Sequence, residues 1–414
     1  MAEADATKNI GLRGVTVADT QVSLVDGENG RLLYRGFAIE DLAESAGFEE
    51  VVFLLLMGRP PGEEDLRSTR LALAEARAVP GPVLDMLRAR PDTADPMDVM
   101  QSAVSALADH DPDLGSTERA AAVRSAMRLI SRFAGVAAAW HRLRSGEEPV
   151  PPDPALSHAA AFLHGLWGRV PTEDETRLMD LLLVLHAEHT FNASTFAVRE
   201  VASTLAHLYA SISAGVGALS GPLHGGANAR VMRMLLEVGD AERVPGWVEQ
   251  RMAAGQRVMG LGHAVYKTED PRAGILRRVA QRVLGGRGGE RWLRLGLEIE
   301  RVARTALRER KGLDLYPNVD FYSSPVLYGL GLAVDMFPVF FGVSRVSGWC
   351  AHFIEERFAE AQPKPALYRP RAHYTGRFCG PEGCRWVPIE ARGAGCPCGN
   401  EFEGCDEEMA VAEP

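Results

Sequence analysis

From about residue 37 to residue 361, apolar side chains recur every three or four positions in one segment after another, the spacing of amphipathic helices. No strand-like run alternates with these segments, which disfavours a parallel sheet with crossover helices. One helix is expected to begin at Asp95-Pro96, an N-cap followed by proline at the first helical position, and to run towards Ala108. The other main expected helices are Ser116–Arg144, Leu178–His189, Thr195–Leu219, Ala229–Val238, Gly246–Met259, Arg291–Lys311 and Val343–Ala361.

Three short β-like runs precede the helices, at Val15–Val17, Gln21–Val25 and Arg31–Tyr34. The last two flank Asp26-Gly27-Glu28-Asn29-Gly30, a segment typical of a hairpin turn. The sequence therefore predicts an all-α protein with a small N-terminal β hairpin.

A chain of 414 residues is long enough for two lobes. Loop signals around Gly260 and Pro317 are candidate hinges. We expect a large lobe made of residues 1–223 and 321–392, with a smaller lobe, residues 224–320, inserted between its two parts. Residues 393–414 form a cysteine-containing extension.

The net charge of -10 disfavours nucleic acid or an anionic membrane as a partner, although a local arginine cluster could still bind a small anion. The N-terminus has neither the basic nor the apolar region of a signal peptide. No apolar run approaches the length of a membrane span. These features predict a cytoplasmic protein.

The octapeptide Gly221–Asn228 places His224 between a Gly-Pro turn and a Gly-Gly pair, just before a helical run. Glycines let a substrate approach the backbone closely. The positive end of a helix disfavours the imidazolium form, so a neutral His224 could donate a hydrogen bond to a carbonyl. Taken alone, the octapeptide also fits a histidine in a glycine-rich turn with no chemical role.

Further segments rich in histidine, aspartate and arginine follow the same pattern of polar groups beside helices. They are His186–Thr195, Gly260–Lys267, Thr268–Arg272, Tyr316–Asp320, Ser344–Trp349 and Tyr368–Arg371. Together with the octapeptide, and in this order, these segments resemble the citrate synthase family, which also includes 2-methylcitrate synthase. The resemblance runs from about Gly14 to Arg392 and includes Leu33-Tyr34-Arg35-Gly36.

The resemblance implies a two-lobed helical enzyme of the short dimeric type. Its expected reaction condenses acetyl-CoA with oxaloacetate and water to citrate and coenzyme A, the entry step of the tricarboxylic acid cycle. In this reaction Asp320 is expected to remove a methyl proton, His224 to donate a hydrogen bond to the thioester oxygen, and His263 to polarise the acceptor carbonyl.

The resemblance also implies the binding residues. Arginine presents the planar fork that suits a carboxylate, and five residues are expected on the acceptor: His189, Asn192, Arg272, Arg345 and Arg369. Coenzyme A is expected to contact Val258, Gly260, Gly262 and Lys267. Arg369 is expected to reach the neighbouring subunit's site, which implies a homodimer with shared sites.

Two alternatives remain from the sequence: 2-methylcitrate synthase, which uses propionyl-CoA, and a non-catalytic member of the family. The chain departs from many relatives at Thr190, Ala264 and Ser324, which bears on substrate preference and rate. No metal or redox cofactor is expected for catalysis, because His186 and His189 at helical spacing lack an obvious third ligand. Metal binding, disulfides and free thiols all remain possible for five late cysteines: Cys379, Cys384, Cys396, Cys398 and Cys405.

Overall fold

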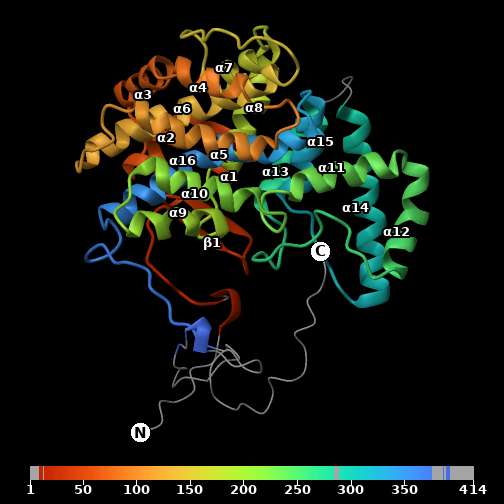
Figure 1. Ribbon diagram of the computed structural model, residues 1–414. Coiled ribbons are helices and arrows are strands. Elements are labelled where there is room, and N and C mark those ends of the chain that lie inside the picture. The colour runs from red at the N-terminus through yellow and green to blue at the C-terminus, as the bar shows by residue number, and fades with distance from the viewer. Residues whose placement is uncertain (1–8, 13, 284–288, 375–385, 387, 392–414) are drawn as a thin grey trace. The chain divides into compact units, whose positions relative to one another are not determined.

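The computed structural model describes residues 9–12, 14–283, 289–374, 386 and 388–391 of the chain (Figure 1). The chain divides into two compact units, Met1–Leu367 and Tyr368–Pro414. The second unit contains one described 3₁₀ turn, Ile389–Ala391. All the helices and strands that concern the site belong to the first unit.

The first unit is built from α-helices, as the sequence predicts. In the described residues the helices are α1 (Ile39–Ser45), α2 (Phe48–Met57), α3 (Glu63–Glu75), α4 (Gly81–Arg88), α5 (Pro96–Leu107), α6 (Arg119–Leu143), α7 (His158–Trp167), α8 (Glu173–His186), α9 (Ala193–Ser203), α10 (Leu208–Ser220), α11 (Ala227–Val238), α12 (Val244–Ala253), α13 (Pro271–Val283), α14 (Gly289–Lys311), α15 (Val319–Gly329) and α16 (Phe337–Arg357). The prediction of an all-α class is confirmed.

The N-terminal hairpin is also confirmed. Strands β1 (Ser23–Asp26) and β2 (Arg31–Tyr34) pair antiparallel, with Ser23 opposite Tyr34. A third strand, β3 (Phe37–Ala38), extends the sheet in the order β1-β2-β3 and was not predicted. The prediction of a strand at Val15–Val17 is wrong, since this segment lies outside the strands of the described residues and Val15 is exposed.

Local capping decides where several helices begin and end. The side chain of Asp95 accepts a hydrogen bond from Met97 N–H (2.8 Å), so the predicted N-cap of α5 is confirmed. The single helix expected over Thr195–Leu219 is instead two helices, α9 and α10. Leu205 between them has a φ of +67°, which a helix cannot accommodate, and His207 caps α10 by accepting from Ala210 N–H.

Helix α16 forms the centre of the first unit. It packs against α2, α6, α8, α9 and α10, and nearly every residue from Phe337 to Glu356 is buried. Figure 1 shows α16 between α2 and α10. A helix that is apolar on all sides is stable only when other elements surround it. The polar residues that it does carry, Arg345, His352 and Glu355 among them, are therefore buried in the interior of the unit.

Helices α11, α13 and α14 all pack against α15, and α12 packs against α14. These helices fall largely within the predicted small lobe, residues 224–320. The contacts group residues 1–367 into one unit, so the boundaries of that lobe stay a prediction. None of the helices in the described part of the chain is long and apolar enough to span a bilayer.

Candidate active site

The predicted site residues of the first unit lie at the ends of helices rather than within one element. They come from the loop between α8 and α9, the turn before α11, the segment before α13, the start of α15 and the middle of α16. The segment before α13 is joined to the start of α15 by main-chain hydrogen bonds. Gly262 N–H donates to the Tyr316 carbonyl (2.8 Å), and Asn318 N–H donates to the Gly260 carbonyl (2.9 Å). This pairing brings the His263 segment and the Asp320 helix together.

His224 is held as a neutral imidazole. Its Nε2 accepts a hydrogen bond from Ser194 N–H (3.3 Å) and lies 2.8 Å from Ser194 Oγ. Because Nε2 accepts, the proton is on Nδ1, which can donate to a ligand. Burial and the charge of Arg345 lower the pKa of His224 to about 4. The sequence predicts the neutral form from a helix terminus, whereas the structure attributes it mainly to burial.

His263 carries its proton on the other ring nitrogen. Its Nδ1 accepts hydrogen bonds from Val265 N–H (3.0 Å) and Tyr266 N–H (3.1 Å), which leaves Nε2 as the donor. Burial and the nearby charge of Arg272 lower the pKa of His263 to about 4. Two neutral imidazoles, each with one nitrogen fixed as an acceptor, thus offer one N–H group apiece.

Asp320 lies in the first turn of α15, whose N-cap Asn318 accepts from the Asp320 N–H. Burial raises the pKa of the Asp320 carboxyl to about 6, while the charge of Arg272 partly opposes the rise. Among the hydrogen bonds of the described residues, none engages this carboxylate. A carboxylate of raised pKa, free of hydrogen bonds, suits a general base that works near neutral pH.

Arg272 is buried and held by Asp270. Its Nε and Nη2 donate to the two oxygens of the Asp270 carboxylate at 3.0 and 2.8 Å. Burial disfavours the charged form, yet the Asp270 carboxylate raises the pKa of Arg272. Asp270 also accepts from Val319 N–H (3.2 Å), so one carboxylate joins the start of α13 to the start of α15.

Arg345 is 1% exposed and has unused hydrogen-bonding capacity. Its Nε donates to the His186 carbonyl (2.8 Å), and its guanidinium lies over the Phe341 ring at 4.7 Å. Its Nη2 is buried with no hydrogen-bond partner in the described residues. Burial lowers the pKa of Arg345 to about 10. A buried guanidinium with an unpaired donor can bind an anionic oxygen.

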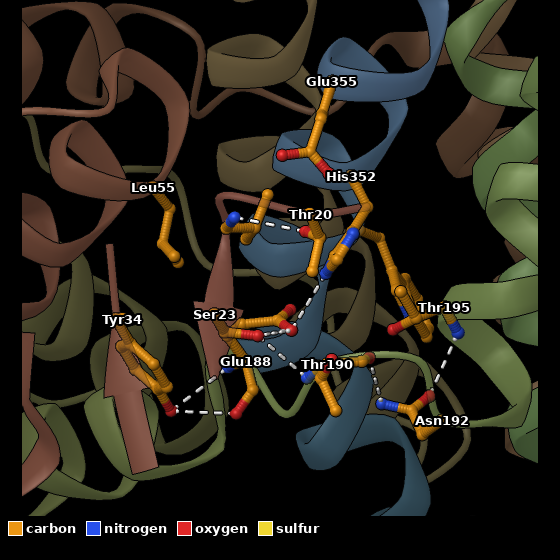
Figure 2. Close-up of polar contacts among 12 residues, drawn as sticks. Thr20, Ser23, Tyr34, Leu55, Glu188, Thr190, Asn192, Thr195, His352 and Glu355 are labelled. Atoms are coloured by element: carbon orange, nitrogen blue, oxygen red, sulfur yellow. Dashed lines mark hydrogen bonds and ion pairs between the residues drawn. The ribbon is translucent and has the colours of Figure 1, made fainter. Parts of the chain in front are cut away.

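The loop between α8 and α9 places His189 beside His263, with ring centroids 5.4 Å apart. His189 Nε2 lies 3.2 Å from the Tyr266 hydroxyl, and burial, with the charge of Arg272, lowers the pKa of His189 well below its usual value. Asn192, predicted as an acceptor ligand, acts in this structure as the N-cap of α9, where its Oδ1 accepts from Thr195 N–H (3.0 Å; Figure 2).

The predicted coenzyme A residues share the segment before α13. Gly260 and Gly262 have φ angles of +78° and +86°, and a Cβ on Gly260 would lie 2.8 Å from the Phe321 side chain, so this backbone position requires glycine. Val258 is buried, whereas Lys267 is exposed and forms an ion pair with Glu28. The structure holds Lys267 at the surface, where a phosphate could reach it.

Two predictions concern residues that do not belong to the first unit. Arg369 belongs to the second unit, where it is exposed, and its place in the acceptor site stays a prediction. The five late cysteines lie outside the described residues. In the described part of the chain, no group of three or more His, Cys, Asp or Glu side chains could hold a metal, and Cys350 is a buried free thiol.

Sequence reasoning missed three residues that hold the site together. Asp270 orients Arg272, Tyr266 contacts both His189 and His263, and Ser194 fixes the tautomer of His224. Asp270 had a local signal, since an aspartate before Pro271 is a typical N-cap. Ser194 had no such signal, because thirty residues separate it from His224.

The cluster combines four chemical capacities. One carboxylate can accept a proton, two neutral imidazoles can donate hydrogen bonds to developing oxyanions, and two buried arginines can bind carboxylates. The positive charge of Arg345 helps to lower the pKa values of His224 and His189 and partly opposes the rise in the pKa of Asp320. Such a site suits removal of a proton next to a carbonyl and attack on an anionic acceptor.

Known proteins share both the sequence and the fold. Residues 11–371 match the family model described as citrate synthase, C-terminal domain. Citrate synthase of Haloferax volcanii is 41% identical over 388 residues, which cover 92% of this chain and 98% of that protein. The 2-methylcitrate synthase of Mycobacterium tuberculosis is 37% identical over 366 residues, 88% of this chain and 90% of that one. A solved ternary complex of citrate synthase from Thermoplasma acidophilum with carboxymethyl coenzyme A and oxaloacetate has a TM-score of 0.83 at 31% identity, and the match covers 92% of this chain and 98% of that one.

Proposed function

The chain belongs to the citrate synthase family of condensing acyltransferases, and from that premise we propose that it condenses acetyl-CoA with oxaloacetate and water to give citrate and coenzyme A. The observation that carries the proposal is that the Asp320 carboxylate has a raised pKa and no hydrogen bond among the described residues, while His224 and His263 each keep one ring nitrogen as a hydrogen-bond donor. We further propose the entry step of the tricarboxylic acid cycle, in the cytoplasm, as its setting.

In the proposed mechanism the Asp320 carboxylate takes a proton from the acetyl methyl group. The Nδ1–H of His224 donates to the thioester oxygen, which gains negative charge as the enolate forms. The enolate carbon then attacks the 2-oxo carbon of oxaloacetate, and the Nε2–H of His263 stabilises the new alkoxide. Water finally attacks the citryl thioester, giving a carboxylate and the free thiol.

The acceptor carries two carboxylates, and the site offers two buried arginines. Arg345 has a free Nη2, and Arg272 is already oriented by Asp270, so neither guanidinium must reorganise greatly to bind. We propose that His189 and Asn192 complete the acceptor site. The thioester would lie along Val258, Gly260 and Gly262, with Lys267 near its phosphates.

We propose that the protein is a homodimer in which Arg369 of one subunit completes the site of the other. A mixture of two inactive variants tests this directly. Arg369→Ala and Asp320→Asn homodimers should both be inactive, whereas coexpressed heterodimers regain one complete site of two. If heterodimers stay inactive although both variants fold and dimerise, Arg369 acts within its own subunit or not at all.

A second candidate, 2-methylcitrate synthase, is supported by the relative from Mycobacterium tuberculosis. One methylene in a pocket discriminates between substrates by only ~10–200-fold. The higher identity to the Haloferax volcanii citrate synthase favours acetyl-CoA.

The deciding experiment measures thiol release with oxaloacetate and either acetyl-CoA or propionyl-CoA at equal concentrations, with Asp320→Asn as the inactive control. A higher kcat/KM for acetyl-CoA supports the proposal, and a higher value for propionyl-CoA supports the second candidate. No release with either substrate, from folded wild-type protein, would establish a non-catalytic family member.

We also propose that catalysis requires no metal or redox cofactor. Dialysis against a chelator should leave turnover unchanged, and a loss that zinc restores would contradict this. Thiol titration of native and unfolded protein, with elemental analysis, distinguishes metal, disulfide and free thiol at the five late cysteines.

A further inference from the structure

The N-terminal hairpin contacts the loop that carries His189. The cross-strand pair Ser23 and Tyr34 faces Glu188, the residue just before this histidine (Figure 2). Ser23 Oγ donates to Glu188 Oε1 (2.9 Å) and accepts from Thr190 N–H (3.1 Å). The Tyr34 hydroxyl accepts from Glu188 N–H (3.2 Å) and lies 3.0 Å from the Glu188 carbonyl oxygen.

This loop needs outside support. Thr190 has a φ of +48°, a left-handed conformation that is unfavourable for a β-branched residue and persists only where the surroundings impose it. Glu188 is fully buried, so its charge also needs partners. One partner is His352 Nε2, 3.0 Å from Glu188 Oε1. Arg199 can only donate, so its contact at 3.1 Å makes Nδ1 of His352 the acceptor and leaves the proton on Nε2.

The turn of the same hairpin contacts the segment that carries His263. Lys267 N–H donates to the Gly27 carbonyl (2.9 Å). A Cβ on Gly27 would lie 2.2 Å from the Val265 carbonyl oxygen, and one on Gly30 would lie 2.6 Å from Thr268 Oγ1. The turn and the His263 segment are therefore in direct backbone contact, possible only with glycine in the turn.

We propose that the hairpin, residues 23–34, is a positioning element of the acceptor site that fixes His189 relative to His263. Its strand ends hold the His189 loop through Ser23 and Tyr34, and its turn holds the His263 segment through Gly27. The two histidines then approach the acceptor from a common support. The identity of the acceptor, a 2-oxo dicarboxylate, rests on the proposed function, whereas the support itself does not.

The kinetic test uses Ser23→Ala, Tyr34→Phe and Gly27→Ala. Ser23→Ala and Tyr34→Phe should each raise the KM for oxaloacetate about tenfold, the effect of one lost buried hydrogen bond. Gly27→Ala should raise it at least as much, because its Cβ would clash with the Val265 carbonyl oxygen. All three should leave the KM for the thioester nearly unchanged. Ser23→Thr keeps the hydroxyl and should restore the wild-type KM. Matched controls are Ser131→Ala, a buried serine bonded to the Leu73 carbonyl, and Gly115→Ala, where a Cβ meets nothing within 4 Å.

Amide hydrogen exchange without substrate tests the support independently of turnover. Ser23→Ala and Tyr34→Phe should increase exchange in residues 187–192, and Gly27→Ala should increase it in residues 263–268. Tyr34→Phe keeps the buried ring, so it remains informative if another variant fails to fold. Exchange changes confined to the hairpin, with an unchanged KM, would overturn the proposal. If the variants show the expected exchange changes but the wild-type protein does not turn over oxaloacetate, only the proposed function is refuted.

Discussion

The same burial that fits Asp320 to act as a base also makes its carboxyl harder to ionise. Burial raises its pKa from 3.8 to about 6, which corresponds to about 3 kcal/mol at 1.36 kcal/mol per pKa unit. The protonated carboxyl cannot accept a methyl proton. The kcat/KM for the thioester at saturating oxaloacetate should therefore fall about tenfold for each pH unit below the pKa. Because the bound dianion adds negative charge, the break should come at or above about pH 6.

The assay follows thioester absorbance between about pH 4.5 and 8 at constant ionic strength. Asp320→Asn keeps the side-chain shape without the base and should lower turnover by ~10²–10⁴-fold. Its residual activity should show no acid limb near pH 6. A wild-type break below about pH 5, or an Asn variant that keeps the limb, would refute the assignment of Asp320 as the base.

Three further predictions concern two buried carboxylates and one glycine of the first unit. Asp270→Asn leaves the buried Arg272 without a counter-charge and should lower the free energy of unfolding by about 3–5 kcal/mol in urea titrations; a loss below about 1 kcal/mol contradicts the role given to this pair. Burial raises the pKa of Asp180 from 3.8 to about 7, so its contribution to stability is complete below about pH 4 and lost as the pH rises through 7. Asp180→Asn should therefore stabilise the protein at about pH 8 by up to about 4 kcal/mol and have little effect near pH 4. Calorimetry that shows the same change in melting temperature at both pH values would exclude this explanation. Gly260→Ala should lower kcat/KM by more than about tenfold, because its Cβ would clash with the Phe321 side chain, while Gly115→Ala should be neutral; equal kinetics for the two variants would show that the loop can adjust.

The sequence predicts features that depend on a few neighbouring residues. The N-cap at Asp95 and the hairpin turn after Asp26 have local patterns, and the structure contains both. The strand expected at Val15–Val17 failed because β propensity needs a paired, half-buried surface, which Val15 does not have. The break at Leu205 inside an apparently continuous helical pattern was missed, since periodicity does not register one left-handed residue.

In the site, too, features set by neighbouring residues could be predicted and features set by distant residues could not. The histidine, aspartate and arginine segments could be located from the sequence, but their protonation states depend on burial and on distant partners. The raised pKa of Asp320 arises from burial in the folded chain. The contact between Ser23 and Glu188 joins residues 165 positions apart, so no local pattern could reveal that a hairpin expected as decoration touches the site.

The buried guanidinium of Arg345 has a consequence for the lifetime of the protein. Among the described residues its Nη2 has no hydrogen-bond partner, so this cation lies in the buried helix α16 with part of its donor capacity unused. A dicarboxylate bound there, as proposed above, would add negative charge beside this cation in the native state, and mass action would then favour folding by RT ln(1 + [L]/Kd). The supply of acceptor would thus control both the flux through the enzyme and its resistance to heat and proteases, with idle enzyme degraded first.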